Sequence, residues 1–277
     1  MGGSTRVPLK IRIAVWLETV PALLKLLGVE RVSLMCHSAG TIYLLNTLYH
    51  LREILDPVKP YVAIIGPWVD TEQSKVFLWS AASKLPVGMF DAWNGLGKFI
   101  QTQIAPSLSW SGGVISAVSG VFSSKPSCAM TPGQRYDTAE DVGKEIEKLQ
   151  VKYFFEEDTT AANEELKLCA KKDVSVTWDV CDDYETYVQT FCTSERARKD
   201  SHQDEPKLEM HVYYAESDMM IGKGGQAYFD KCWNQSMVSE VVDYHSVELS
   251  GTDHDSALID QDKGAMKHIF AAVGRAR

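Results

Sequence analysis

The sequence predicts an α/β fold, in which a mostly parallel β-sheet is flanked by helices. Short apolar runs at Val32–Cys36 and Tyr61–Ile65 have the composition of buried strands, and a helical pattern lies between them. The same alternation of strand and helix returns after residue 206. A strand, a helix and a second strand in succession indicate a parallel βαβ unit.

The elements near the N-terminus follow in a clear order. Apolar residues at helical spacing predict a helix over Ile13–Leu27, and Gly28 is suited to end it. The strand at Val32–Cys36 leads directly into a helix predicted over Ala39–Ile54. Asp56-Pro57 ends this second helix, because proline cannot continue the hydrogen-bond pattern.

The middle of the chain has a different pattern. It is mostly helical from residue 67 to 206, first rich in Trp and Phe and then acidic and amphipathic. We expect residues 67–206 to form a large helical cap, or lid. The cap would be inserted into a core made of residues 1–66 and 207–277.

Strand signals return in the last part of the chain, at Glu209–Tyr214 and Glu240–Val247. A helix is predicted between them over Gly225–Gln235, and a last helix over Lys263–Val273. The core therefore reads as strand, helix and strand on each side of the insertion.

Composition and charge exclude several classes of partner. The hydrophobic content of 45% and charged content of 23% are typical of a soluble globular protein. The net charge of -9 argues against nucleic acid as a partner. The six cysteines lack metal-ligand spacing, so no metal and no cofactor is expected. With no signal-peptide pattern and no run of about 20 apolar residues, we expect a cytoplasmic protein without a transmembrane segment.

A five-residue motif directly follows the first strand: Cys36-His37-Ser38-Ala39-Gly40. A serine at the apex of so tight a strand-to-helix turn holds its hydroxyl clear of the sheet. Small residues are needed two positions before and after it, where strand and helix nearly touch. The backbone N–H of Ala39, at the start of the helix, would face a developing oxyanion.

This motif resembles the nucleophile elbow of the α/β-hydrolase family, whose usual pattern is Gly-x-Ser-x-Gly, with Cys36 in place of the first glycine. The resemblance covers about residues 12–67 and 207–275. It implies an α/β-hydrolase-like core in which a helical cap follows the strand after the elbow helix. Because four strands usually precede the elbow strand in this family, the sequence resembles an N-terminally truncated member.

The family order of a catalytic triad is serine, acid and histidine, with the last two on loops after late core strands. His254 lies in a polar loop after the last predicted strand, where the family has its general base. Asp218 follows the preceding strand and matches the orienting acid, with Glu216 as the second choice. The resemblance therefore implies a Ser38-His254-Asp218 triad.

The expected substrate is a small acyl or ester molecule, and the expected chemistry is hydrolysis through an acyl-enzyme. Four aromatic or imidazole side chains are candidates for contacting it: His37, Trp68, Trp79 and Trp93. The aromatic residues of the insertion suggest an apolar substrate, although they could equally form the core of the cap. Two alternatives stay open: acyl transfer by the same triad, and a catalytically impaired or non-catalytic remnant that binds a partner.

The predicted lack of early strands has a physical consequence. The strand Val32–Cys36 would lie at the edge of the sheet, apolar and unpaired on one side. Such an edge favours pairing with another chain, so self-association is expected. The nucleophile would also be less well supported, and we expect a weak enzyme or none.

Overall fold

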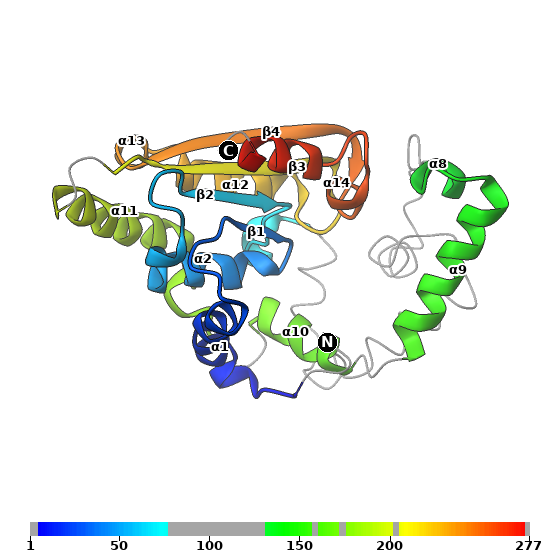
Figure 1. Cartoon of the computed structure of the whole chain (residues 1–277), viewed down its shortest axis with the longest axis horizontal. Helices are drawn as coiled ribbons and strands as arrows, with labels where there is room; N and C mark the ends of the chain where they lie inside the picture. Colours follow the sequence, from blue (N-terminus) through cyan, green and yellow to red (C-terminus); the bar gives the residue numbers. More distant parts are fainter. Residues whose placement is uncertain (1–4, 77–130, 157–159, 172–175, 202–204, 275–277) are drawn as a thin grey trace.

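The computed structural model describes residues 5–76, 131–156, 160–171, 176–201 and 205–274. Its centre is a four-stranded sheet in the order β1-β2-β3-β4, shown in Figure 1. The strands are β1 (Leu34–His37), β2 (Tyr61–Ile65), β3 (Leu208–Ser217) and β4 (Val242–Asp253). Each neighbouring pair is parallel. The predicted α/β architecture with a parallel sheet is therefore confirmed.

Helices connect the strands as expected for βαβ units. Helix α2 (Gly40–His50) joins β1 to β2, and α12 (Gly222–Trp233) lies between β3 and β4. The other helices are η1 (Leu9–Ile11), α1 (Arg12–Leu27), η2 (Arg52–Ile54), α3 (Thr71–Ser74), α8 (Pro132–Arg135), α9 (Glu140–Glu156), α10 (Thr160–Cys169), η4 (Asp179–Cys181), α11 (Tyr184–Ser201), α13 (Ser236–Ser239), α14 (Ser256–Ile259) and α15 (Met266–Gly274).

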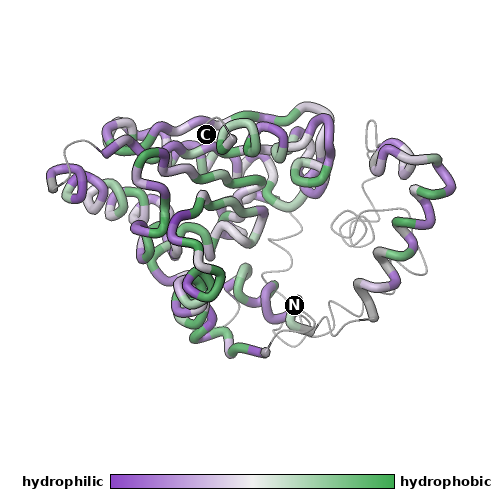
Figure 2. The backbone as a smooth tube through the Cα atoms, in the orientation of Figure 1, coloured by the Kyte–Doolittle hydropathy of each residue, from purple (hydrophilic) through white to green (hydrophobic). Residues whose placement is uncertain are grey.

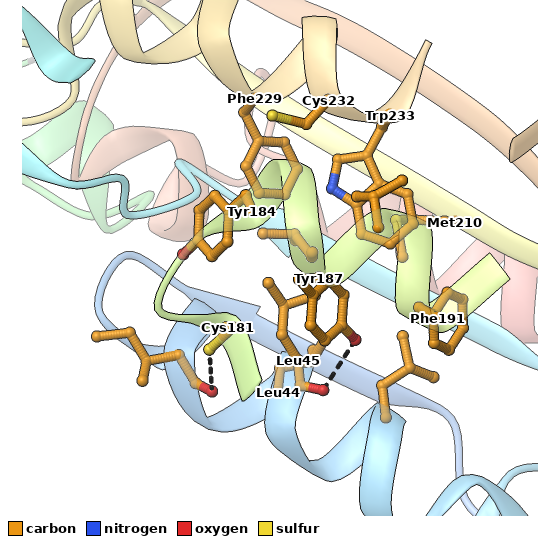
Figure 3. Packing of buried hydrophobic residues seen from close by; sticks show 14 of the residues in the cluster. Leu44, Leu45, Cys181, Tyr184, Tyr187, Phe191, Met210, Phe229, Cys232 and Trp233 are labelled. Carbon is orange, nitrogen blue, oxygen red and sulfur yellow. Dashed lines mark hydrogen bonds between the residues drawn. The ribbon is translucent and has the colours of Figure 1, made fainter. Parts of the chain in front are cut away.

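One face of the sheet is covered by α2, α11 and α12, whose side chains form a large aromatic core (Figure 3). Tyr187 from α11 stacks on Phe191 and donates its hydroxyl proton to the backbone oxygen of Leu45 on α2, at 2.9 Å. Trp233 of α12 lies against the rings of both Tyr187 and Phe191. Burial of each of these large side chains contributes about 1.5–3 kcal/mol, so α11 is tied firmly to the sheet.

The opposite face carries a smaller core. Here Ala63, Ile65 and Tyr213 of the sheet pack with Ala257 of α14 and Ile269 of α15. Successive residues of a strand point to opposite faces of the sheet. Because different helices cover the two faces, every residue of β2 is buried. Figure 2 shows the resulting hydrophobic stretch along β2 and the hydrophilic outer end of α11.

The structure describes only part of the range predicted as a cap. Residues 77–130 lie outside the described residues, and Trp79 and Trp93 are among them. Figure 1 shows α8 and α9 standing away from the sheet. Helix α11, in contrast, shares the hydrophobic core of the sheet through Tyr187 and Phe191. The cap therefore stays a prediction, and α11 packs as part of the core rather than as a lid.

The strand β1 lies at the edge of the four-stranded sheet, next to β2 only among the described residues. A groove of about 1290 Å³ runs along this edge between β1, α2 and α1. Its walls are mainly apolar and include Leu24 of α1, Leu34 of β1 and Leu44 of α2. The edge itself exposes Met35, so the predicted apolar edge strand is present in the structure.

No helix in the described part of the chain is both long enough and apolar enough to cross a membrane.

We expect the purified chain to associate through the β1 edge at micromolar concentrations. A Met35→Lys variant should shift it toward monomer, because a charge on an edge strand opposes strand pairing. Sedimentation velocity measures the change. The matched control is Phe270→Lys, which places the same charge at an exposed apolar residue of α15. Association that survives Met35→Lys but not Phe270→Lys would assign the contact to α15 instead.

Candidate active site

The turn after β1 has the strained geometry of a nucleophile elbow. Ser38 adopts a left-handed backbone conformation with φ of 54°, which is uncommon for a residue other than glycine. Its backbone N–H donates to the backbone oxygen of Ile65 at 2.9 Å, and its backbone oxygen accepts from the Thr41 hydroxyl at 2.7 Å. These bonds fix the serine between β2 and the first turn of α2.

The residues two positions before and after Ser38 must be small because strand and helix nearly touch there. A side-chain carbon added at Gly40 would lie 3.0 Å from the Cβ atom of Cys36. Strand and helix are therefore in close contact on either side of Ser38. Burial raises the pKa of the Cys36 thiol to about 12, so this cysteine acts as a small packing residue rather than as a nucleophile.

Ala39 begins the helix that follows the elbow, as its N-cap. Its backbone N–H has no acceptor among the described residues, whereas the N–H groups of Thr41 and Ile42 are bonded to backbone oxygens. An unpaired N–H at the positive end of α2 can stabilise a negative oxygen close to Ser38. This placement supports the predicted oxyanion role of Ala39.

Asp218 and His254 form a buried pair. Asp218 Oδ2 lies 2.8 Å from His254 Nδ1, and the two side chains are 1% and 6% exposed. The other carboxylate oxygen of Asp218 accepts from the backbone N–H groups of Met220 and Ile221, at 2.8 and 2.9 Å. Because an ionised carboxylate only accepts, Nδ1 carries the proton, and in the neutral ring Nε2 of His254 keeps a lone pair that can accept one.

The two partners shift each other's titration. Burial lowers the pKa of His254, but the hydrogen bond and charge of Asp218 outweigh it, and the pKa lies above the usual 6.5. Burial has the opposite effect on the carboxylate and raises the pKa of Asp218. The hydrogen bond from His254 and those from the two backbone N–H groups outweigh it, so the pKa of Asp218 lies below its usual value. The pair is thus arranged to stabilise an imidazolium at His254.

The structure also decides between the two candidate acids. Glu216 is exposed, and its Oε2 accepts from the backbone N–H of Gly251 at 2.5 Å. It does not bond His254. Ser217 and Asp253 are partners in the β3–β4 register, so the next residues, Asp218 and His254, emerge side by side.

His37, predicted as a substrate contact, belongs to the elbow and lies against His254. Its Nε2 donates to the backbone oxygen of His254 at 2.9 Å, and the two ring centroids are 4.6 Å apart. Burial, and then the proximity of His254, hold the pKa of His37 below its ordinary value. It is therefore a neutral donor near pH 7, and its Nε2 is already engaged.

Trp68 is not placed to contact a substrate. Its ring is buried in the core, and its indole N–H donates to the Cys169 oxygen at 3.1 Å. Trp68 therefore packs in the hydrophobic core and does not have the predicted contact with substrate. Its backbone N–H bonds the Thr41 hydroxyl at 3.0 Å, which steadies the elbow from the β2 side. Trp79 and Trp93 lie outside the described residues.

Sequence reasoning missed Gly66, the first residue after β2. A side-chain carbon at Gly66 would lie 3.2 Å from Cε1 of His254 and 3.5 Å from Oδ2 of Asp218. Its position directly after a predicted strand was the signal available in the sequence. The carboxyl ends of neighbouring parallel strands meet at one edge of the sheet, so Gly66 lies at the same edge as Ser38.

The described residues contain no group of three or more His, Cys, Asp or Glu side chains that could hold a metal ion. The Ser38 hydroxyl makes no hydrogen bond to His254 or to any other described residue. The groove along β1 reaches the elbow, where Cys36, His37 and Gly40 line it. The arrangement can therefore supply a nucleophile, a base with its orienting acid, and one oxyanion donor beside an apolar groove.

Solved structures with a similar fold include a hydrolase from Pseudomonas aeruginosa (13% identity, TM-score 0.50), which aligns with 99% of this chain and 76% of its own. A mutant epoxide hydrolase from Bacillus megaterium matches at 10% identity and TM-score 0.50, over 98% of this chain and 79% of its own. An esterase matches at 14% identity and TM-score 0.50, over 96% of this chain and 67% of its own.

The chain has the α/β-hydrolase fold. No family model and no curated protein matches the sequence. With identities of 10–14%, the likeness to these α/β-hydrolase-fold structures establishes the fold and not the activity. The assignment of chemistry to this α/β-hydrolase-fold chain must rest on its own site.

The His254–Asp218 pair predicts how reaction at Ser38 depends on pH. His254 accepts a proton only when neutral, so the rate should fall as pH is lowered, with a midpoint above 6.5. Asp218→Asn should move the midpoint to lower pH, because it removes the charge that favours the imidazolium. It should also slow turnover about 10⁴-fold, the loss typical of this change in Ser-His-Asp triads.

The measurement is the rate of Ser38 modification by a fluorophosphonate across pH 5 to 9. Glu216→Gln is the matched control, since it removes a carboxylate from the same strand end without touching His254. Equal midpoints for Asp218→Asn and the unaltered chain would contradict the assigned pair.

Proposed function

We propose that this chain is a serine hydrolase of ester or related acyl bonds. The observation that carries the proposal is the hydrogen-bonded Asp218–His254 pair at the sheet edge where the strained Ser38 also lies. Ordinary packing does not require a serine with positive φ and a buried carboxylate–imidazole pair at the same sheet edge. Their combination supports nucleophilic catalysis.

In the proposed reaction the Ser38 hydroxyl oxygen attacks the carbonyl carbon of the substrate, and its proton passes to Nε2 of His254. Asp218 keeps the ring oriented through Nδ1 and stabilises the imidazolium. The carbonyl oxygen becomes negative and accepts from the Ala39 N–H. When the tetrahedral intermediate collapses, the leaving alcohol takes the proton from His254. Water then releases the acid by the same steps.

The apolar groove supports an apolar acyl substrate. It lies between α1, β1 and α2 and reaches His37 and Gly40, which flank Ser38 and Ala39 in the elbow. Each methylene moved from water to such a surface contributes about 0.8 kcal/mol. An acyl chain extending from Ser38 into the groove would therefore gain affinity with length.

The first test is hydrolysis of a p-nitrophenyl ester and labelling of Ser38 by a fluorophosphonate. Ser38→Ala should abolish both, because the nucleophile is removed, whereas Ser246→Ala on the exposed part of β4 should change neither. Release of free acid supports hydrolysis. Transfer of the acyl group to an added alcohol would instead favour an acyltransferase, and absence of labelling would favour the non-catalytic alternative.

A second prediction concerns chain length. Between p-nitrophenyl acetate and hexanoate, kcat/KM should rise about three- to fourfold for each added methylene. Leu24→Asn, on the α1 wall of the groove, should weaken this dependence. Leu26→Asn is the matched control on the same helix, at a residue that is 83% exposed and does not line the groove. A flat dependence in the unaltered chain would remove the groove from the substrate site.

A further inference from the structure

The imidazole of His254 is enclosed on two sides by residues that take no part in the chemistry described above. Gly66 at the end of β2 lies against the edge of the ring that carries Cε1 and Nδ1. His37 at the end of β1 holds the backbone oxygen of the same histidine. Asp218 fixes only the position of Nδ1, so the other contacts of the ring determine where Nε2 points.

Gly66 has two properties that a larger residue could not share. Its φ of +52° is in the left-handed region, where side chains other than those of Asn and Asp are strained. In addition, an added methyl group would stand 3.2 Å from Cε1 and 3.3 Å from Nδ1 of His254. Both distances are shorter than ordinary van der Waals contacts of a side-chain carbon, so the ring would have to move by a few tenths of an ångström.

The backbone of Gly66 is itself fixed. Its N–H donates to the Tyr213 oxygen at 2.8 Å, which continues the pairing of β2 with β3 beyond the last strand residue. Ile65, immediately before it, accepts from the Ser38 N–H at 2.9 Å. The glycine cannot retreat from the ring without disturbing the elbow, so an added side chain must displace His254.

His37 constrains the histidine from the other side. A backbone carbonyl can only accept, so Nε2 of His37 must carry the proton in the bond to His254. The ring of His37 also lies at a tilt of 42° to the ring of His254, which limits rotation toward the elbow. The loop that bears the base is thereby tied to the residue next to the nucleophile.

We propose that Gly66 and His37 are positioning residues that set the direction of the His254 ring: Gly66 by leaving space for it, and His37 by fixing its backbone. Neither touches the reacting atoms. This inference rests on the proposed function, because the direction of Nε2 matters only if His254 serves Ser38. A displacement of about 1 Å can cost about 10²-fold in rate, so a shift of a few tenths of an ångström should cost about tenfold.

The test compares Gly66→Ala with Gly28→Ala. Gly28 also has a left-handed backbone, with φ of 66°, but nothing lies within 4 Å of an added side-chain carbon there. The left-handed strain that both variants share should lower Tm by about 2–4 °C, and the contact with His254 should lower it further in Gly66→Ala. Only Gly66→Ala should slow fluorophosphonate labelling of Ser38, by about tenfold. Gly66→Asn, which suits a left-handed backbone but is bulkier, should be slower still.

A pH profile separates positioning from a loss of stability. In Gly66→Ala the ring is pushed from Asp218, so the midpoint of the labelling profile should move to lower pH, whereas in Gly28→Ala it should not move. For His37, the Gln variant keeps a donor toward the His254 oxygen and should retain more activity than the Leu variant. If Gly66→Ala does not fold, the comparison of His37→Gln with His37→Leu tests the positioning role.

Titration of His254 followed by NMR gives the readout that does not depend on any reaction. If the unaltered chain is not labelled at Ser38, the proposed function fails, yet the His254 midpoint should still shift in Gly66→Ala. Unchanged labelling and an unchanged His254 midpoint in Gly66→Ala, with His37→Leu equal to His37→Gln, would overturn the inference.

Discussion

The candidate site depends on the parallel register of four strands. Each strand ends at the same edge of the sheet, and the residue after each one enters the site: Ser38 after β1, Gly66 after β2, Asp218 after β3 and His254 after β4. Backbone hydrogen bonds between neighbouring strands fix these four positions relative to one another. A slip of one residue would turn each side chain to the other face of the sheet, so the register sets the chemistry as much as the side chains do.

Burial of the Asp218–His254 pair is the energetic cost of this arrangement. A charged carboxylate away from water is unfavourable unless its oxygens are all engaged. Here one oxygen accepts from His254 and the other from two backbone N–H groups. The large core on the α11 face and the smaller one on the α15 face offset that cost and the backbone strain at Ser38. The site is thus maintained by packing elsewhere in the molecule.

Much of this could be predicted from local sequence. The apolar runs identified the four strands of the described sheet, although β3 continues past its run to Ser217 and β4 to Asp253, because backbone pairing continues there. The motif around Ser38 and the loop positions of Asp218 and His254 indicated the components of the proposed triad. The roles of Gly66 and Trp68 were not predictable in this way. Their contacts lie across the sheet or across the core, and no local pattern records them.

The sequence by itself determined which residue types could act and in what order they occur along the chain, because strand runs, turn residues and the small residues of the elbow are local properties. Tertiary structure decided which carboxylate bonds the histidine, and that Trp68 is buried. Asp218 and Glu216 are two residues apart and both carry a carboxylate, yet only Asp218 leaves the sheet beside His254. The reason is the pairing of β3 with β4, which arises only when segments distant in sequence are hydrogen-bonded in one register.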